Sequence, residues 1–250
     1  VTSLRLSNCN LTGYLPDDIG DIDTLSELYF DSNEITGTIP SSIIKLTQLY
    51  VMDITSALLS GHIPPLPTSL VSLFLQTNCL SGPMPSSLVG ISSLTAIDMR
   101  YNMLTGTILT GLSFMPNIVS VALRSNYFTG PVLSPLPQQL QTIDVSENML
   151  SGHLPTYWCS GGCQVYSIEV GGNSIHGGIP STLGDLSKLS TLNISSNFLS
   201  SSIPNTISAY TKLRVADFSS NYLTGFLDTI LGMPLLKWLD ISNNFLSGPI

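Results

Sequence analysis

The chain has 250 residues, a formal net charge of −8 and a sequence pI near 4.5. Hydrophobic residues make up 43% of it, which is ample for a core, but charged residues make up only 10%, well below the ~25% of ordinary soluble domains. The eight basic residues are scattered singly, so the composition argues against nucleic-acid binding, which requires basic patches.

One sequence pattern recurs along the whole chain. L-x-x-L-x-L-x-x-N-x-L-x-G-x-I-P occurs eleven times, at a spacing of 21 to 25 residues, and this period predicts a solenoid of stacked coils. We expect a single array over residues 1–250 without terminal caps. Its repeats begin near residues 1, 25, 49, 70, 94, 118, 140, 165, 189, 213 and 236. The uncharged stretch 101–123 keeps the repeat register, so we expect two repeats there and no membrane span.

Each repeat is predicted to open with a short strand. In Leu192-Asn193-Ile194 apolar and polar residues alternate, as in a strand that buries one face, so Leu192 and Ile194 should point inward. Asn197 follows at a turn, where its side-chain amide can donate to and accept from backbone groups of neighbouring turns. Nine of the eleven repeats keep this asparagine. The other two carry Cys9 and Ala57.

The return half of each repeat is predicted to be a short helical or 3₁₀ piece. It begins after an Ile-Pro step, as in residues 181–186, because proline lacks an N–H group and belongs at edges and turns. The repeats at 49–69 and 118–139 carry Pro-Leu-Pro in place of this piece. We therefore expect their outer segments to be extended.

L-x-L-x-x-N followed by L-x-G-x-I-P resembles the consensus of the plant-type leucine-rich repeat. The chain is similar to the ectodomains of plant receptor-like kinases and receptor-like proteins, and to polygalacturonase-inhibiting proteins. The resemblance implies an α/β repeat solenoid: a leucine-rich-repeat superhelix with a parallel concave β-sheet and short 3₁₀, helical or extended outer segments. It also implies an extracellular or cell-surface location. The cysteine-paired caps of such ectodomains are missing, and because the family includes receptors, co-receptors and enzyme inhibitors, the function stays open.

The four cysteines fall into two groups. Cys9 and Cys79 lie three repeats apart, about 14 Å along the stack against a bridging limit of about 7 Å, so they cannot pair, and we expect Cys9 to be a buried free thiol. Cys159 and Cys163 flank a flexible Ser-Gly-Gly stretch, so a local disulfide is expected, with two free thiols as the alternative.

Two sequons predict N-linked glycans. They are Asn10-Leu-Thr and Asn193-Ile-Ser, and both asparagines are expected to be exposed. Because Asn193 belongs to the concave sheet, a glycan there would exclude a partner from the ninth repeat.

The sequence offers no catalytic constellation. His62 and His153 occupy equivalent loop positions about 19 Å apart by strand spacing, too far to share a metal ion. His176 lies near the glycine bend of its own repeat, and the repeat geometry places no serine, cysteine or carboxylate beside any of the three. We expect no enzyme activity, no metal and no cofactor.

Departures from the repeat consensus cluster on the concave face of the second to sixth repeats. They form the predicted ligand-binding site: Glu27, Tyr29, Asp31, Phe74, Gln76, Asp98, Arg100, Tyr101 and Arg124. Outward-facing aromatics and arginines are the residue types enriched at binding hot spots. Arg100 and Arg124 occupy the same position in adjacent strands, about 4.8 Å apart, which suits a carboxylate or sulfate. The alternative is that Asp98 neutralises both arginines and nothing binds.

These features predict an extracellular, non-enzymatic recognition module that binds a peptide or protein ligand on the concave face, as part of a receptor-like ectodomain. One alternative is a structural cell-surface protein that self-assembles by repeat stacking. A second alternative is an inhibitor of a secreted wall-degrading enzyme.

Overall fold

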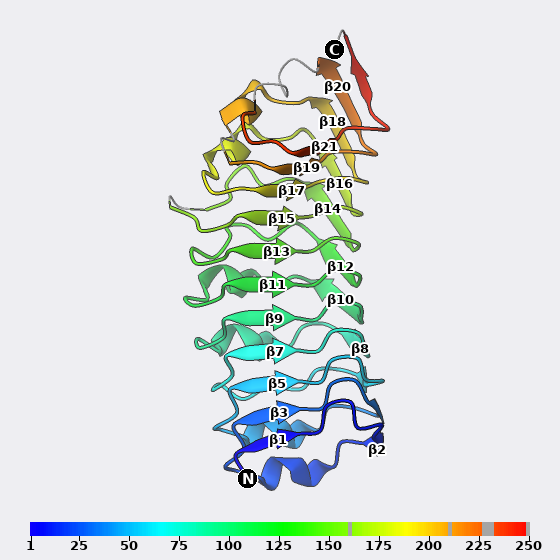
Figure 1. The fold of residues 1–250 in the computed structure, drawn as a ribbon, viewed down its shortest axis with the longest axis vertical. Coiled ribbons are helices and arrows are strands. Elements are labelled where there is room, and N and C mark those ends of the chain that lie inside the picture. The colour runs from blue at the N-terminus through cyan, green and yellow to red at the C-terminus, as the bar shows by residue number, and fades with distance from the viewer. Residues whose placement is uncertain (160–161, 210–211, 227–232, 249–250) are drawn as a thin grey trace. The chain divides into compact units, whose positions relative to one another are not determined.

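A computed structural model describes residues 1–159, 162–209, 212–226 and 233–248 (Figure 1). The chain divides into two compact units, Val1–Phe128 and Thr129–Ile250, and each is described by itself. Both units are stacks of coils, one coil for each predicted repeat. The predicted single array over the whole chain stays a prediction.

The first strands of the coils form a parallel sheet, called the front sheet below, which has eleven strands in chain order. Six lie in the first unit: β1 (Ser3–Arg5), β3 (Glu27–Tyr29), β5 (Val51–Asp53), β7 (Ser72–Phe74), β9 (Ala96–Asp98) and β11 (Ser120–Ala122). Five lie in the second: β13 (Thr142–Asp144), β15 (Ser167–Glu169), β17 (Thr191–Asn193), β19 (Val215–Asp217) and β21 (Trp238–Asp240). The predicted parallel sheet is confirmed.

Each front strand buries its middle residue. Leu28 of β3 is fully buried and pairs in register with Met52 of β5, while Glu27 and Tyr29 on either side of Leu28 are half-exposed. This is the alternation that the sequence predicts, because successive side chains of a strand point to opposite faces. The outward positions of neighbouring strands therefore align across the front sheet.

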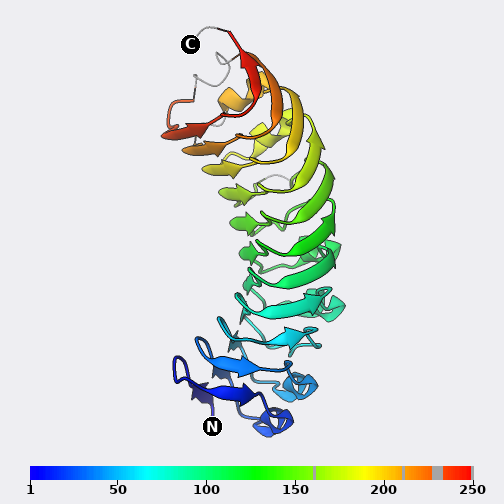
Figure 2. The ribbon, with the colours of Figure 1, turned by 90° about the vertical axis from the view of Figure 1, so that its right-hand side faces the viewer.

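A second parallel sheet, called the back sheet, is built from the residues that follow the conserved asparagine (Figure 2). Its strands are β6 (Ser60–Gly61), β8 (Cys79–Gly82), β10 (Met103–Thr107), β12 (Tyr127–Gly130), β14 (Met149–His153), β16 (Ser174–Gly177), β18 (Phe198–Ser202), β20 (Tyr222–Phe226) and β22 (Phe245–Ser247). In the first two coils β2 (Thr12–Tyr14) and β4 (Glu34–Thr36) pair separately. These strands are not expected from the repeat pattern.

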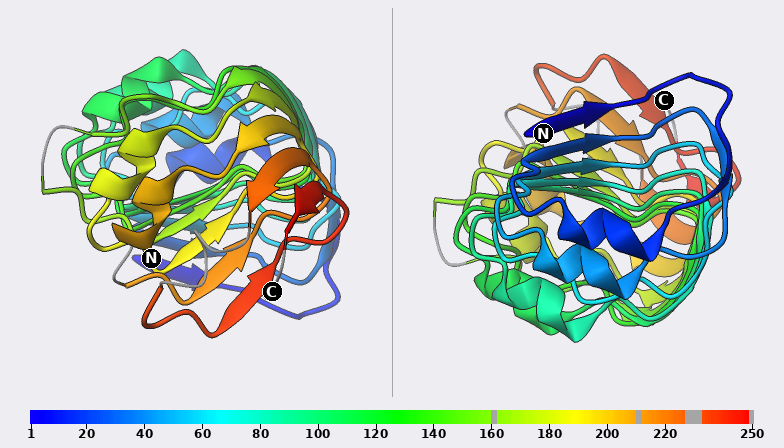
Figure 3. Two further views of the ribbon diagram at one scale, coloured as in Figure 1. Left: turned by 90° about the horizontal axis from the view of Figure 1, so that it is seen from above. Right: turned by 90° about the horizontal axis from the view of Figure 1, so that it is seen from below.

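The return segments contain single 3₁₀ helices, as predicted. They are η1 (Asp17–Asp21), η2 (Ser41–Lys45), η3 (Ser86–Gly90) and η4 (Thr110–Phe114) in the first unit, and η5 (Ser181–Asp185) and η6 (Asn205–Ala209) in the second. An extended proline precedes η1, and its carbonyl accepts the first helical bond, from the Ile19 N–H at 3.1 Å. The helices η1 and η2 lie side by side (Figure 3, right). The Pro-Leu-Pro segments at 65–67 and 135–137 form no helix, and the expectation that they are extended stays a prediction.

The conserved asparagines tie each coil to the one before it. Asn102 is buried, and its Nδ2 donates to the Leu75 carbonyl of the preceding repeat at 2.9 Å and to the Met99 carbonyl of its own repeat at 3.1 Å. Its Oδ1 accepts the Leu80 N–H of the preceding repeat at 3.0 Å. Seven further asparagines repeat this arrangement: Asn33, Asn78, Asn126, Asn173, Asn197, Asn221 and Asn244. The predicted role of this position is confirmed.

The expectation that Cys9 is buried is wrong, because Cys9 is exposed. It belongs to the first coil, which only the second coil covers in this structure, and Leu4 and Leu6 of that coil are also partly exposed. The Cys9 thiol lies 3.3 Å from the Ser7 carbonyl, to which it donates. Cys79 is exposed as well.

Candidate ligand-binding face

All nine predicted site residues lie in the first unit, on or beside the front sheet. Four are outward residues of the strands themselves: Glu27, Tyr29, Phe74 and Asp98. The other five follow the strands: Asp31, Gln76, Arg100, Tyr101 and Arg124. Eight of the nine are half-buried, and Tyr101, in a turn with a φ of 54°, is 47% exposed. The front sheet therefore brings the predicted residues onto one face, with Tyr101 at its rim.

Glu27 organises a polar cluster at one end of this face. Its carboxylate accepts hydrogen bonds from the Arg5 guanidinium at 2.7 Å, the Ser3 hydroxyl at 2.8 Å and the Tyr50 hydroxyl. These donors, Tyr50 first, lower the pKa of Glu27 to about 2. The Arg5 guanidinium also lies over the Tyr29 ring, 4.4 Å from its centroid.

Three members of this Glu27 cluster were missing from the sequence prediction: Ser3, Arg5 and Tyr50. The strand register gives a signal that could have found the first two, because Ser3 pairs with Glu27 and Arg5 with Tyr29. Tyr50 precedes β5 and lies outside the alternating strand residues, so its contact with Glu27 is evident only from the folded structure.

Arg100 is held by Asp98 of its own repeat. The guanidinium makes a bidentate contact, with Nη2 2.6 Å from Asp98 Oδ2 and Nε 3.0 Å from Asp98 Oδ1. The Asp98 side chain is 13% exposed and that of Arg100 is 38% exposed. The alternative of neutralisation by Asp98 is thus realised for Arg100. Arg124 stands at the equivalent position after the next strand, since Asp98 pairs with Ala122.

Phe74 lies between two acidic side chains on this face. It pairs in register with Asp53 on one side and with Asp98 on the other. Partial burial raises the pKa of Asp53, and its carboxylate accepts the Thr55 hydroxyl at 2.6 Å. Next to Phe74, the amide oxygen Oε1 of Gln76 is buried without a hydrogen-bond partner among the described residues. Such an acceptor carries a desolvation cost that a ligand donor can remove.

Acidic residues at the outward ends of other front strands close the turns that follow them. Asp217 Oδ1 accepts both the backbone N–H and the hydroxyl of Ser219, two residues on, at 3.0 and 2.7 Å. The same Asp-x-Ser arrangement occurs at Asp144. The turn geometry therefore accounts for these two carboxylates.

The structure brings together two histidines whose contact the repeat pattern did not predict. His153 of β14 pairs with His176 of β16, and their ring centroids are 4.4 Å apart. Among the residues that the structure describes, no group of three or more histidine, cysteine or acidic side chains is placed to hold a metal ion.

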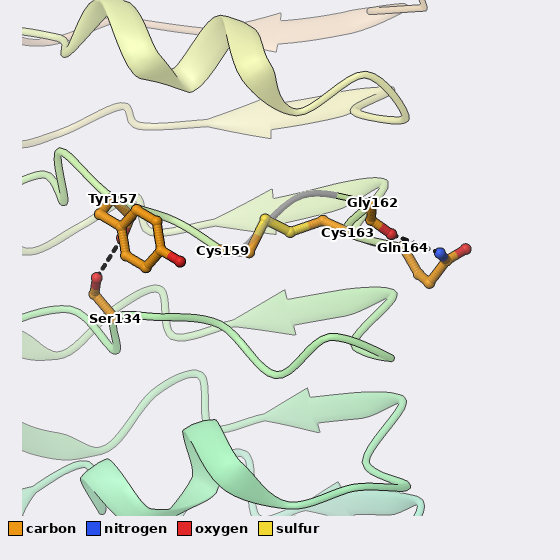
Figure 4. The surroundings of a disulfide bond; sticks show 6 residues. All are labelled: Ser134, Tyr157, Cys159, Gly162, Cys163 and Gln164. Atoms are coloured by element: carbon orange, nitrogen blue, oxygen red, sulfur yellow. Dashed lines mark hydrogen bonds between the residues drawn. A yellow bond between two sulfur atoms is a disulfide. The ribbon is translucent and has the colours of Figure 1, made fainter.

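The predicted local disulfide is present between Cys159 and Cys163, whose Cα atoms are 6.3 Å apart (Figure 4). The Gly162 carbonyl beside it accepts from the Gln164 amide at 2.7 Å. Of the two sequon asparagines, Asn10 is exposed as expected. Asn193 is half-buried rather than exposed, and its Oδ1 accepts the Ser195 N–H at 2.9 Å in the turn after β17.

In the described part of the chain, no helix has the length and apolar character needed to cross a bilayer.

Comparison with known proteins places the chain among leucine-rich-repeat proteins. The family model described as Leucine Rich Repeat matches residues 1–22, 24–46, 139–160 and 188–209. Receptor-like protein 53 of Arabidopsis thaliana is 31% identical over 199 residues, which cover 77% of this chain and 18% of that protein. The chain spans less than a fifth of the length of the curated relatives that it matches.

Two solved receptor structures are similar over nearly the whole chain. The Arabidopsis receptor kinase HAESA, in complex with the peptide hormone IDA and the co-receptor SERK1, has a TM-score of 0.92 at 31% identity, covering 99% of this chain and 42% of that one. PEPR1, in complex with AtPEP1, has a TM-score of 0.90 at 30% identity, covering 99% of this chain and 36% of that one. The chain is therefore a leucine-rich-repeat protein of the type found in the ectodomains of plant receptor-like kinases and receptor-like proteins.

Proposed function

We propose that this protein is an extracellular, non-enzymatic recognition module that binds a peptide or protein across strands β3 to β11 of its front sheet. The observation that carries the proposal is Phe74, a half-buried aromatic side chain at an outward position of β7. Gln76, two residues on, has a buried amide oxygen without a hydrogen-bond partner among the described residues, and a ligand N–H would satisfy it. The two features describe a shallow apolar contact with one fixed hydrogen-bond acceptor.

The charges around Phe74 indicate what kind of segment fits. Asp53 and Asp98 flank the ring, and Arg100 is pre-organised by Asp98, so its guanidinium keeps one orientation. A peptide that lies along the sheet would place an apolar side chain on Phe74 and polar groups on the charged residues. The complexes of HAESA with the peptide hormone IDA and of PEPR1 with AtPEP1 support a peptide as the ligand class.

Substitution of Phe74 and Arg100 on the front sheet tests the proposal. A displayed random peptide library is selected on the immobilised protein, and the enriched peptides are measured by surface plasmon resonance against the variants. Phe74→Ala with Arg100→Ala should weaken binding from several-fold to about a hundredfold, or about 1–3 kcal/mol, as expected for hot-spot residues. Met103→Ser, which changes an exposed residue of the back sheet, is the matched control and should leave binding unchanged.

Two outcomes would contradict the proposal. Enriched peptides that bind the double variant as tightly as the unchanged protein would remove the front sheet as the site. Light scattering that shows an ordered polymer, and no selectable peptide binding, would favour the structural alternative.

A further inference from the structure

The back sheet of the second unit holds a pair of histidines that the proposed recognition face does not use. His153 is the last residue of β14, and His176 is its direct partner in β16. Both side chains are exposed, and their rings meet edge to face with centroids 4.4 Å apart and planes at 72°. The backbone ladder fixes the two histidines on neighbouring strands, so a ligand that binds both rings orders only the two side chains.

A glycine makes room for this pair. A Cβ atom at Gly177, the residue after His176, would come within 2.4 Å of His153 Cδ2. The φ of Gly177 is +83°, a conformation that residues with a side chain rarely adopt. The His153 ring therefore lies over bare backbone, next to His176.

The separation of the rings fits two ligands of one metal ion. With a metal–nitrogen bond of about 2.0 Å and a ring centre about 1.2 Å beyond the nitrogen, two imidazoles at a right angle have centres about 4.5 Å apart. A tetrahedral angle would require about 5.2 Å by the same geometry. The observed 4.4 Å therefore matches the right angle of tetragonal Cu²⁺ and Ni²⁺ sites. A turn of an exposed imidazole about its Cβ–Cγ bond keeps the ring centre nearly in place and changes the direction of its nitrogens, so binding of one ion by both rings requires such a turn from the edge-to-face contact.

We propose that His153 and His176 form a two-histidine site for a divalent transition-metal ion, with Cu²⁺ and Ni²⁺ preferred. Imidazole is a ligand that suits these ions. No third histidine, cysteine or carboxylate is grouped with the pair in the described part of the chain. Water fills the remaining positions, so the ion is exchangeable and open on its solvent side.

A matched control exists in the same protein. His62 is also exposed, and it lies over Gly82 in the way that His153 lies over Gly177, since a Cβ at Gly82 would meet His62 Cδ2 at 2.0 Å. The strand register that pairs Gly61 with Leu80 places Ser81 opposite His62, where His153 has His176, so His62 has no second imidazole beside it. A single imidazole gives no chelate.

The experiment is Ni²⁺ titration of the untagged protein by isothermal calorimetry, in a Cys9→Ser, Cys79→Ser background that removes the exposed thiols. We expect one Ni²⁺ per chain, about tenfold or more weaker in His153→Ala and in His176→Ala, because each leaves one ligand of the chelate. His62→Ala should bind as the background does. Electron paramagnetic resonance of one equivalent of Cu²⁺ should show two coordinated nitrogens, and one in either variant.

The proposal is overturned if the His153→Ala, His176→Ala double variant binds Ni²⁺ like the background, or if His62→Ala weakens binding as much as His153→Ala does. The three histidines are exposed, and a circular-dichroism melt of each variant checks that the fold is kept.

Discussion

At the scale of single residues, the buried asparagines are the polar groups on which the stack depends. The Asn102 amide nitrogen donates to carbonyls of two repeats, and its amide oxygen accepts an N–H of the preceding repeat. Stacking removes these backbone groups from water, so nothing else is available to satisfy them once the side chain is lost.

Replacement of Asn102 by alanine should therefore lower the free energy of unfolding by about 1–3 kcal/mol, the cost of leaving buried polar groups unpaired. Urea denaturation followed by circular dichroism measures the change. Asn117→Ala is the control, because the Asn117 side chain is exposed and its amide donates to the Ser92 carbonyl. Its effect should stay within about 0.5 kcal/mol, and an equal loss in both variants would contradict this role of the asparagines.

Glu27 predicts a pH dependence of stability with a defined sign. Its pKa falls from 4.5 to about 2 in the folded protein, so the fold favours the ionised carboxylate. That stabilisation is fully present above pH 4.5 and is lost as the pH falls through about 2. The melting temperature of the unchanged protein should exceed that of Glu27→Gln at pH 7, and the difference should shrink between pH 4.5 and 2.

Asp53 provides the opposite control, since burial raises its folded pKa. The raised pKa means that the fold disfavours the ionised Asp53 carboxylate, so the contribution of Asp53 to the stability of the fold increases as the pH falls. The melting temperature of Asp53→Asn should consequently exceed that of the unchanged protein at neutral pH, and the difference should disappear in acid. Parallel pH profiles for the two variants would show that the hydrogen bonds to Glu27 do not act as described.

At the scale of elements, the 3₁₀ helices pack closely where one helix meets the next. Gly20 of η1 is buried, and a Cβ there would come within 2.4 Å of the Ser42 carbonyl oxygen of η2. Gly90 at the end of η3 has nothing within 4 Å of its Cβ position. The two glycines thus differ in the space around them.

Gly20→Ala should lower the free energy of unfolding by about 1–3 kcal/mol, because the clash is with backbone that must shift. Gly90→Ala should be neutral or stabilising by up to about 1 kcal/mol, since it lowers the entropy of the unfolded chain. Thermal unfolding of both variants checks the contrast, and a stable Gly20→Ala would mean that η1 and η2 are less tightly packed than in this structure.

The elements also show what the sequence could predict and what it could not. Front strands follow from strict alternation, as in Leu192-Asn193-Ile194, and the helix-free return segments follow from Pro-Leu-Pro, because these patterns are local. The back-sheet strands also alternate around one buried residue, as around Leu104 in β10, but they pair only when coils stack. They pair with a shift of two residues relative to the repeat, as in His176 with Phe198. His153 therefore meets His176, although the repeat pattern aligns His153 with Gly178.

The site shows the same division between local and non-local information. Phe74 and Arg100 could be found because each breaks a consensus position of its own repeat. The partners of Glu27 and the exposure of Cys9 depend on which coils lie beside them, which one repeat does not reveal.

At the scale of the whole molecule, solubility depends on few charges. A net charge of −8 at pH 7 is carried by a chain with only 10% charged residues, and the sequence pI is near 4.5. Because a net charge near zero promotes association, we expect light scattering of a micromolar solution to rise steeply as the pH approaches about 4.5 and to fall again below it. Flat scattering from pH 7 to 3.5 would mean that the serine, threonine and asparagine surface suffices without net charge.

The asparagine ladder has a direction. In the first unit, Asn33 and Asn102 make hydrogen bonds with carbonyl and N–H groups that precede them in the chain. A chain that emerges from the ribosome can therefore complete the inter-repeat side-chain bonds of each coil as soon as that coil is made. Synthesis and folding can then proceed in the same order, and at any moment the last coil synthesised is the one still without a following coil.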